Sequence, residues 1–159
     1  MIELRKITED NFEECIDLEI TKEQENYVAS NKYSLAEAYA LTNGDYTPMP
    51  YAIYNGDNMV GFIMAVYQPI DENDPDDDED VYYLPRLMID KRYQSKGYGK
   101  QAMIKILELI RTFKYGKASA VILSCNCNNI TAYQLYLALG FVDTGEIDED
   151  GDSYLKLNI

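Results

Sequence analysis

The chain has 159 residues, which suits one domain over 1–159, and a hydrophobic content of 47% excludes a wholly disordered protein. Its 14 basic and 28 acidic side chains give a net charge of −14, which opposes nucleic-acid binding because phosphate contacts need cations. No apolar run approaches the roughly 18 residues that a membrane span needs, and no signal-peptide core is present, so we expect a cytoplasmic protein.

The residue types also limit the chemistry. The chain has no histidine and only three cysteines, Cys15, Cys125 and Cys127, so we expect no disulfide framework and no zinc site. Serine–histidine catalysis is excluded for the same reason. Acid–base steps would fall to carboxylates, tyrosine, cysteine, lysine or water, and we interpret the thiols as packing groups.

Two helices are predicted behind a short N-terminal strand. Apolar spacing favours a helix over 7–20, with Thr8 or Asp10 as its N-cap. A second helix is predicted over 34–44, with Ser34 as its N-cap. It also contains a capping-box glutamate and a terminating glycine, Glu37 and Gly44.

The middle of the chain is typical of β-structure. Two β-rich runs within 50–68 flank the turn Asn55-Gly56-Asp57-Asn58 and predict a hairpin. After an acidic run, residues 81–89 predict another strand, in which Pro85 indicates a bulge or a break in ladder pairing.

The rest of the chain alternates helices and strands. A long amphipathic helix is predicted from Gly99 to Gly116, followed by a buried strand over 119–126 and a helix over 129–140. Two strands, 141–147 and 153–159, end the chain. The order predicts a mixed α/β domain without internal repeats or an interdomain linker.

The stretch "QSKGYG" places Gln94, Gly97 and Gly99 between a strand and a helix. Free N–H groups at a helix start, together with the helix dipole, form an anion site, and glycine lets the backbone approach a pyrophosphate. Three cations add charge there: Arg92, Lys96 and Lys100. The alternative is an ordinary strand-to-helix turn. The stretch matches neither a Walker loop nor a dinucleotide fingerprint.

With "RLMID" before it and "NITAYQLYLALGF" about 30 residues after it, this stretch resembles the paired motifs of the GNAT superfamily of N-acetyltransferases. The resemblance covers nearly the whole chain. It implies a mixed, mostly antiparallel central sheet with helices on both faces. It also implies that the strands within 82–89 and 119–126 are parallel neighbours that splay apart to form a cofactor cleft.

The resemblance further implies that acetyl-CoA is the acetyl donor, and from the residue types we expect no metal. Backbone groups of one strand would bond the pantetheine arm: Leu87, Met88 and Ile89. The loop N–H groups would bind the pyrophosphate: Gln94, Ser95, Lys96, Gly97, Tyr98, Gly99 and Lys100. Asn129 would meet the pantetheine and Ala132 would leave room for it, although Asn129 could also be a plain helix N-terminal residue.

Direct acetyl transfer to an amine requires a proton acceptor for the amine and a proton donor for the departing thiolate. Tyr136 matches the tyrosine with which the family protonates the leaving sulfur; the alternative is a core tyrosine, one of 15 in the chain. Family members often carry the base on the strand before the loop, but "YYLPR" has no carboxylate there. The candidate carboxylates for binding the acceptor or acting as the general base are Glu25, Glu79 and Asp80. Each could equally be a solvated surface group.

Charge indicates the acceptor. Residues 71–80 carry eight acids, whereas 85–117 carry nine basic and two acidic side chains. An acidic mouth beside the cleft would attract a polycation, and "EQENYVASNKYSLAEAY" with "PRLMIDKRYQSKGYGKQAM" resembles small bacterial spermine/spermidine acetyltransferases. We therefore expect a small cationic polyamine as substrate and no nucleic-acid or membrane partner. The alternatives are another cationic amine (an aminoglycoside, a protein N-terminus or a lysine) and a non-catalytic CoA-binding sensor. Exposed edges of the C-terminal strands allow a homodimer.

Overall fold

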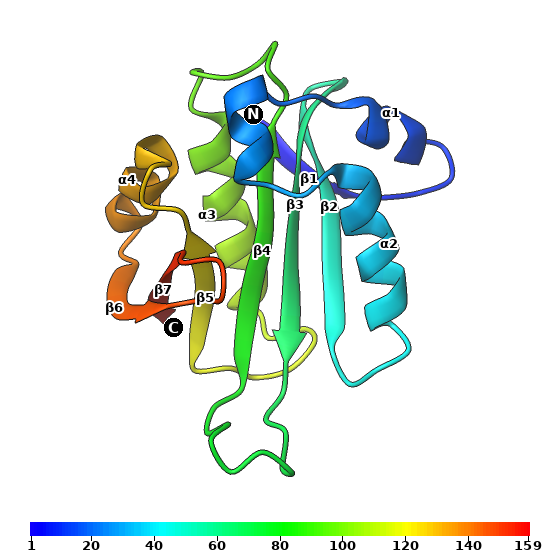
Figure 1. Cartoon of the computed structure of the whole chain (residues 1–159). Coiled ribbons are helices and arrows are strands. Elements are labelled where there is room, and N and C mark those ends of the chain that lie inside the picture. Colours follow the sequence, from blue (N-terminus) through cyan, green and yellow to red (C-terminus); the bar gives the residue numbers. More distant parts are fainter.

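The computed structural model describes residues 1–159 as one seven-stranded sheet in the order β1-β2-β3-β4-β5-β7-β6, flanked by helices (Figure 1). The elements are β1 (Ile2–Lys6), α1 (Phe12–Asp17), the 3₁₀ helix η1 (Lys22–Asn26), α2 (Asn31–Leu41), β2 (Thr47–Asn55), β3 (Asn58–Gln68), β4 (Val81–Ile89), α3 (Tyr98–Ile110), β5 (Ala120–Cys125), α4 (Ile130–Ala138), β6 (Val142–Ile147) and β7 (Ser153–Asn158). Every neighbouring pair of strands is antiparallel except β4 and β5. The predicted fold class is confirmed.

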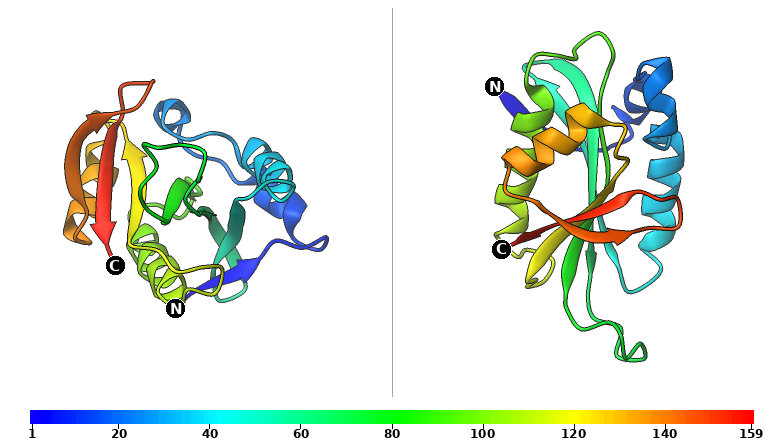
Figure 2. Two further views of the ribbon diagram at one scale, coloured as in Figure 1. Left: turned by 90° about the horizontal axis from the view of Figure 1, so that it is seen from below. Right: turned by 60° about the vertical axis from the view of Figure 1, so that its left-hand side comes forward.

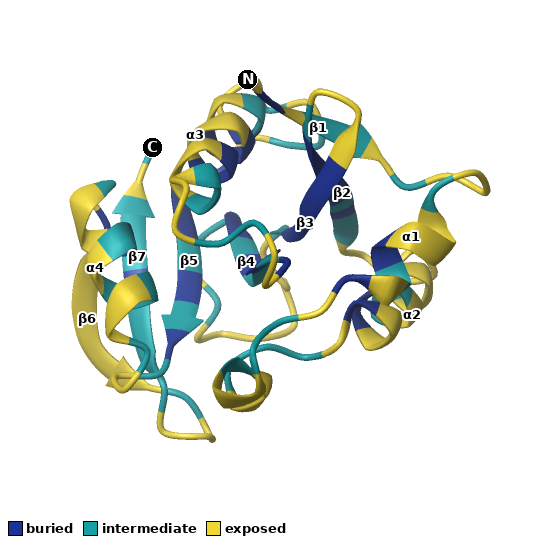
Figure 3. Ribbon diagram, turned by 90° about the horizontal axis from the view of Figure 1, so that it is seen from above, coloured by how far each residue is buried: buried dark blue, intermediate teal, exposed yellow.

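Helices cover both faces of the sheet (Figure 2). Because side chains alternate along a strand, β3 sends Phe62 and Met64 to the face covered by α1 and α2, and Ile63 to the face covered by α3. Apolar residues of α3, including Met103 and Ile106, fill the core on that second face. Dark, buried strand segments accordingly lie between the two helical layers when the molecule is viewed from above (Figure 3).

Strands β4 and β5 separate soon after they meet. Their parallel pairing covers only Val81–Tyr83 against Ala120–Ile122, although both strands continue beyond it. The pairing of β4 with β3 shifts register between Met64 and Val66, so that Leu84 and Pro85 stand opposite a single residue. The bulge predicted from Pro85 is therefore confirmed, and it lies where the splay begins.

Some predicted helix boundaries and caps are wrong. Helix α2 begins at Asn31, and the N-cap is Ser30, whose side chain accepts a hydrogen bond from the Tyr33 N–H. Ser34 lies inside the helix and bonds the Ser30 carbonyl, so Glu37 is not part of a capping box. Ser30 and Ser34 are both residues that can cap a helix. Which of them does so depends on tertiary contacts that no local sequence pattern reveals.

Other boundaries differ in smaller ways. The N-cap of α1 is Asn11, and the 3₁₀ helix η1 was not predicted. Helix α3 ends at Ile110, before Gly116. Gly116 has another role: a Cβ there would lie 2.3 Å from Cζ of Tyr67, so glycine is needed for the close approach of that ring.

At the sheet edge, all six residues of β6 are exposed. The homodimer that could form through such an edge stays a prediction. None of the helices is long and apolar enough to span a membrane.

Candidate active site

The splayed half of β4 leaves backbone groups free on its β5 side. The Asp90 N–H donates to the Val60 carbonyl at 2.8 Å, which fixes the alternation of the antiparallel ladder with β3. Met88 therefore directs its backbone groups to β3, whereas Leu87 and Ile89 direct theirs to the open side. The Ile89 carbonyl is already bonded by Nε2 of Gln94 at 2.9 Å. Free groups on this side thus belong to Leu87 and to the Ile89 N–H, not to Met88.

The loop between β4 and α3 presents unbonded amide groups. None of the N–H groups of residues 94–100 donates a hydrogen bond within the protein, and the first such donor is Gln101, to the Gly97 carbonyl at 3.2 Å. Gly97 has φ of 78°, a left-handed conformation that favours glycine. At Gly99 a Cβ would make only ordinary contacts, 3.8 Å from Ile89 and 3.9 Å from Leu135. The contacts of the fold itself therefore do not require glycine at 99.

A buried carboxylate anchors the start of this loop. Asp90 is 1% exposed and accepts hydrogen bonds from the Glu19 N–H at 2.9 Å and from Arg92 Nε at 2.8 Å. Burial alone would raise the pKa of the Asp90 carboxyl, but the bonds from Arg92 and Glu19 outweigh burial and hold the pKa below its usual value. The sequence analysis did not predict this role of Asp90, because it interpreted its partner Arg92 as a cation that faces the ligand.

The side chain of Gln94 ties the loop to η1. Its Nε2 donates to Oε1 of Gln24 at 2.8 Å as well as to Ile89. Gln24 is itself fixed by a capping box with Thr21, a pattern that was present in the sequence and was overlooked. Gln94 thus shapes the loop through its side chain.

Helix α4 brings Tyr136 to the other wall of the splay. The Tyr136 side chain is 8% exposed and packs edge-on against Phe141 at 5.9 Å between ring centroids. Its hydroxyl makes no hydrogen bond in the protein, yet no fully enclosed polar side-chain atom lacks a partner, so the hydroxyl reaches an accessible surface. Burial, and then nearby Cys125, raises the pKa of Tyr136, which keeps the hydroxyl protonated at neutral pH.

Two further residues of the second motif lie on the same helix. Asn129 stands at the N-cap of α4, but its side chain makes no capping hydrogen bond and is free. Ala132 packs, partly buried, against the core shared with Tyr136. Cys125 is buried, and burial with nearby Asp152 raises the pKa of its thiol to about 11, so it remains protonated.

The three candidate carboxylates do not lie together. Glu79 bonds Lys156 and Ser119, and those hydrogen bonds lower its pKa, while Asp80 accepts from the Ile70 N–H at 2.8 Å. Both belong to the loop between β3 and β4, at the end of β4 opposite the glycine loop (Figure 1). Glu25 lies in η1 and lines a pocket of about 690 Å³ beside Met88. Of the three, only Glu25 has no partner in the protein.

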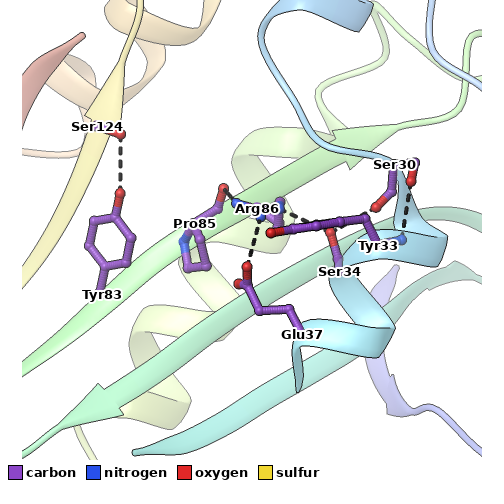
Figure 4. A network of polar contacts seen from close by, with 8 residues as sticks. All are labelled: Ser30, Tyr33, Ser34, Glu37, Tyr83, Pro85, Arg86 and Ser124. Carbon is purple, nitrogen blue, oxygen red and sulfur yellow. Dashed lines mark hydrogen bonds and ion pairs between the residues drawn. The ribbon is translucent and has the colours of Figure 1, made fainter. Parts of the chain in front are cut away.

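A polar network that sequence reasoning missed stands beside the bulge (Figure 4). Arg86 donates from Nε to Ser34 Oγ at 3.0 Å, from Nη1 to the Pro85 carbonyl at 3.0 Å, and from Nη2 to Glu37 Oε2 at 3.4 Å. On the other side of the bulge, the hydroxyls of Tyr83 and Ser124 bond at 3.1 Å across the base of the splay. The sequence analysis assigned Glu37 to a helix cap and therefore did not predict its contact with Arg86.

The geometry defines a protein with an amide-lined anion loop beside a splayed parallel strand pair. The acetyltransferase (GNAT) family model matches residues 4–141. A spermine/spermidine N(1)-acetyltransferase of Bacillus subtilis (strain 168) is 31% identical over 154 residues, covering 97% of this chain and 96% of the relative. The chain therefore belongs to the GNAT family of acetyltransferases and is an acyltransferase.

Solved structures agree at the level of the fold. The spermidine N-acetyltransferase from Vibrio cholerae in complex with CoA and spermine has a TM-score of 0.70 and 17% identity, covering 99% of this chain and 94% of that one. The aminoglycoside acetyltransferase AAC(6')-Ib in complex with coenzyme A has a TM-score of 0.74 and 16% identity, covering 99% and 95%. Both hold CoA, in agreement with acetyl-CoA as the expected donor.

Proposed function

We propose that this enzyme transfers an acetyl group from acetyl-CoA directly to a primary amine of a polyamine such as spermidine or spermine. The assignment of acetyl-CoA as the donor rests on the unbonded N–H groups of residues 94–100 at the start of α3, which suit a pyrophosphate. The acceptor class rests on the 31% identity with a spermine/spermidine acetyltransferase over nearly the whole chain and on the net charge of −14.

The residues fit the donor along its length. The Leu87 backbone and the Ile89 N–H lie on the open side of β4 and would bond an extended pantetheine arm as an added strand does. The free amide of Asn129 and the small Ala132 would face the same arm from the start of α4. Lys96 on the loop and Lys100 in the first turn of α3 are exposed and add positive charge for the phosphates.

Tyr136 would supply the proton for the leaving group. The amine nitrogen bonds the acetyl carbon, the carbon–sulfur bond breaks, and the sulfur takes the proton of the Tyr136 hydroxyl. A hydroxyl that is protonated at neutral pH, accessible and free of protein partners suits this role. No covalent enzyme intermediate is needed, in accord with the protonated thiol of Cys125.

The acceptor would be held by carboxylates. Glu25 is exposed and lines the pocket beside Met88, so it is the best placed of the three candidates for a distal ammonium group. Glu79 and Asp80 are engaged by Lys156, Ser119 and the Ile70 N–H, and would act through the field of the acidic loop.

The experiment follows free-thiol release from acetyl-CoA with a panel of amines: spermidine, spermine, kanamycin and a peptide with a free N-terminus. We expect turnover with the polyamines and little with the others. Preferential turnover of kanamycin would support the aminoglycoside alternative, whose fold-level precedent is AAC(6')-Ib. CoA binding without thiol release from any amine would favour the sensor and overturn the proposal.

A further inference from the structure

A carboxylate stands beside the bulge of β4, although β4 carries none there. Figure 4 shows Glu37, from α2, reaching toward Arg86 and Pro85. Arg86 holds one oxygen of Glu37, Oε2, at 3.4 Å, and the other oxygen, Oε1, accepts no hydrogen bond in the protein. The side chain of Glu37 is 30% exposed, so part of it is open to a ligand.

The position of Glu37 is fixed from several sides. The Arg86 guanidinium is 16% exposed and also bonds Ser34 and the Pro85 carbonyl, so helix α2 and the bulge are held by one rigid group. The Tyr33 ring, one turn before Glu37, lies 5.8 Å from the Arg86 guanidinium carbon and is 58% exposed. A carboxylate with an exposed aromatic ring one helical turn away suits an ammonium group.

The two faces of the splay carry different groups. Arg86 and Met88 point to the face covered by α2, and Met88 belongs to the core on that face. Tyr136 belongs to the core on the α3 face. A nucleophile that approaches from the α2 face would therefore meet the acetyl carbon on the side away from the hydroxyl that protonates the sulfur.

We propose that Glu37 binds the reacting amine at the bulge and accepts its proton during acetyl transfer, and that Arg86 is the positioning residue that holds Glu37 there. This assignment rests on the proposed function. It supplies the base that the sequence of β4 lacks.

The protons balance as follows. The bound ammonium releases one proton to solvent, and its nitrogen lone pair then forms the bond to the acetyl carbon. The adduct nitrogen gives a second proton to Oε1 of Glu37. The carbon–sulfur bond breaks with its electron pair on sulfur, which takes the Tyr136 proton. Solvent carries the proton from Glu37 back to Tyr136, so one turnover yields an amide, free CoA and one released proton.

The first test compares Glu37→Gln with Glu13→Gln, which removes an equal charge from the exposed face of α1. For Glu37→Gln we expect kcat with spermidine to fall about 100-fold, the size typical of a lost general base. Its KM for spermidine should rise, while acetyl-CoA affinity and Tm stay close to those of the wild type. Glu37→Asp should recover part of kcat, and Glu13→Gln should leave kinetics unchanged.

Three further variants separate catalysis from packing. Ser34→Ala removes the other contact of Arg86 with α2 but leaves Glu37, so we expect only a small loss of kcat. Arg86→Met should reduce kcat more than Arg86→Lys, which keeps a cation near Glu37 but loses the fork of donors. Equal losses of kcat and Tm in Ser34→Ala and Glu37→Gln would make the network a docking contact and overturn the proposal.

The failure of this assignment and that of the proposed function are distinguishable. A wild-type enzyme that releases no thiol with any amine fails the proposed function, and the assignment of Glu37 falls with it. An active wild type together with Glu37→Gln at unchanged kcat and KM removes Glu37 alone. Turnover of kanamycin but not of spermidine would overturn the polyamine acceptor, while Glu37 would keep its proposed role with a different amine.

Discussion

Tyr136 combines burial of its ring with access of its hydroxyl, and each property has a separate consequence. Burial packs the ring against Phe141 and raises the pKa, so the proton is retained across the neutral range. The hydroxyl has no hydrogen-bond partner in the protein and is not fully enclosed, so a sulfur atom in the cleft would be its first acceptor. A tyrosine that served only the core would gain more from a satisfied hydroxyl.

Replacing Tyr136 by Phe therefore tests the hydroxyl without disturbing the ring. We expect kcat to fall at least tenfold and the dissociation constant of acetyl-CoA to change less than twofold, because phenylalanine keeps the packing and loses only the proton. Steady-state kinetics and calorimetric titration measure the two quantities. Because the pKa is raised above its ordinary value near 10, any alkaline decline of wild-type kcat below that pH must come from another group. Full turnover in the variant would contradict the role.

At the scale of elements, Asp90 joins the end of β4 to the segment after α1. Its carboxylate accepts from the Glu19 N–H and from the Arg92 backbone and guanidinium, all at the point where the glycine loop leaves the sheet. A buried charge with several donors is stabilising only while it is ionised. The geometry of the loop is thus tied to the protonation of one carboxyl group.

Replacing Asp90 by Asn should lower the free energy of unfolding by about 2 kcal/mol at pH 7, the scale of a hydrogen bond to a charged group. The folded pKa is depressed, so this stabilisation is present above the unfolded value near 3.9 and is lost as pH falls through the folded pKa. The difference between wild type and variant in urea unfolding should therefore shrink as the pH falls from about 4. Asp45→Asn, at an exposed site, is the control and should show no difference. A difference that persists at the lowest pH would contradict ionic anchoring.

At the scale of the molecule, local sequence signals predicted most of the elements, whereas the arrangement of the sheet was implied by the resemblance to the GNAT superfamily. Pro85 indicated the bulge and the glycine turns separated the strands, and the structure bears out both. Contacts between distant elements could not be predicted. Glu37 meets Arg86 across 49 positions, and Gln24 meets Gln94 across 70, so neither pair leaves a periodic pattern. The site therefore contains groups that only the folded chain brings together.

The acidic loop lies far from the loop that would bind the phosphates. The nine residues of β4 separate the loop after β3 from the glycine loop, a span of roughly 30 Å at the usual rise of a strand. The acidic loop and the cations around the glycine loop, Arg92, Lys96 and Lys100, therefore lie at opposite ends of one strand (Figure 1). The phosphates of CoA and a polycation would be drawn to different ends of β4.

This distribution of charge predicts how ionic strength affects the KM for the polyamine. Raising ionic strength from about 0.01 to 0.15 M shortens the Debye length from about 30 to about 8 Å, so the field of the −14 protein no longer reaches an approaching polyamine. We expect the KM for spermidine to rise severalfold over this range, with kcat nearly constant, because the proposed contact of the bound amine with Glu37 would act at short range, where salt screens little. Replacing Asp76, Asp77 and Asp78 together by Asn should reduce the salt dependence of KM without changing kcat. Initial rates at fixed, saturating acetyl-CoA measure both quantities. A KM that is insensitive to salt would mean that long-range charge plays no part in choosing the amine, which would leave recognition to the groups beside the bulge.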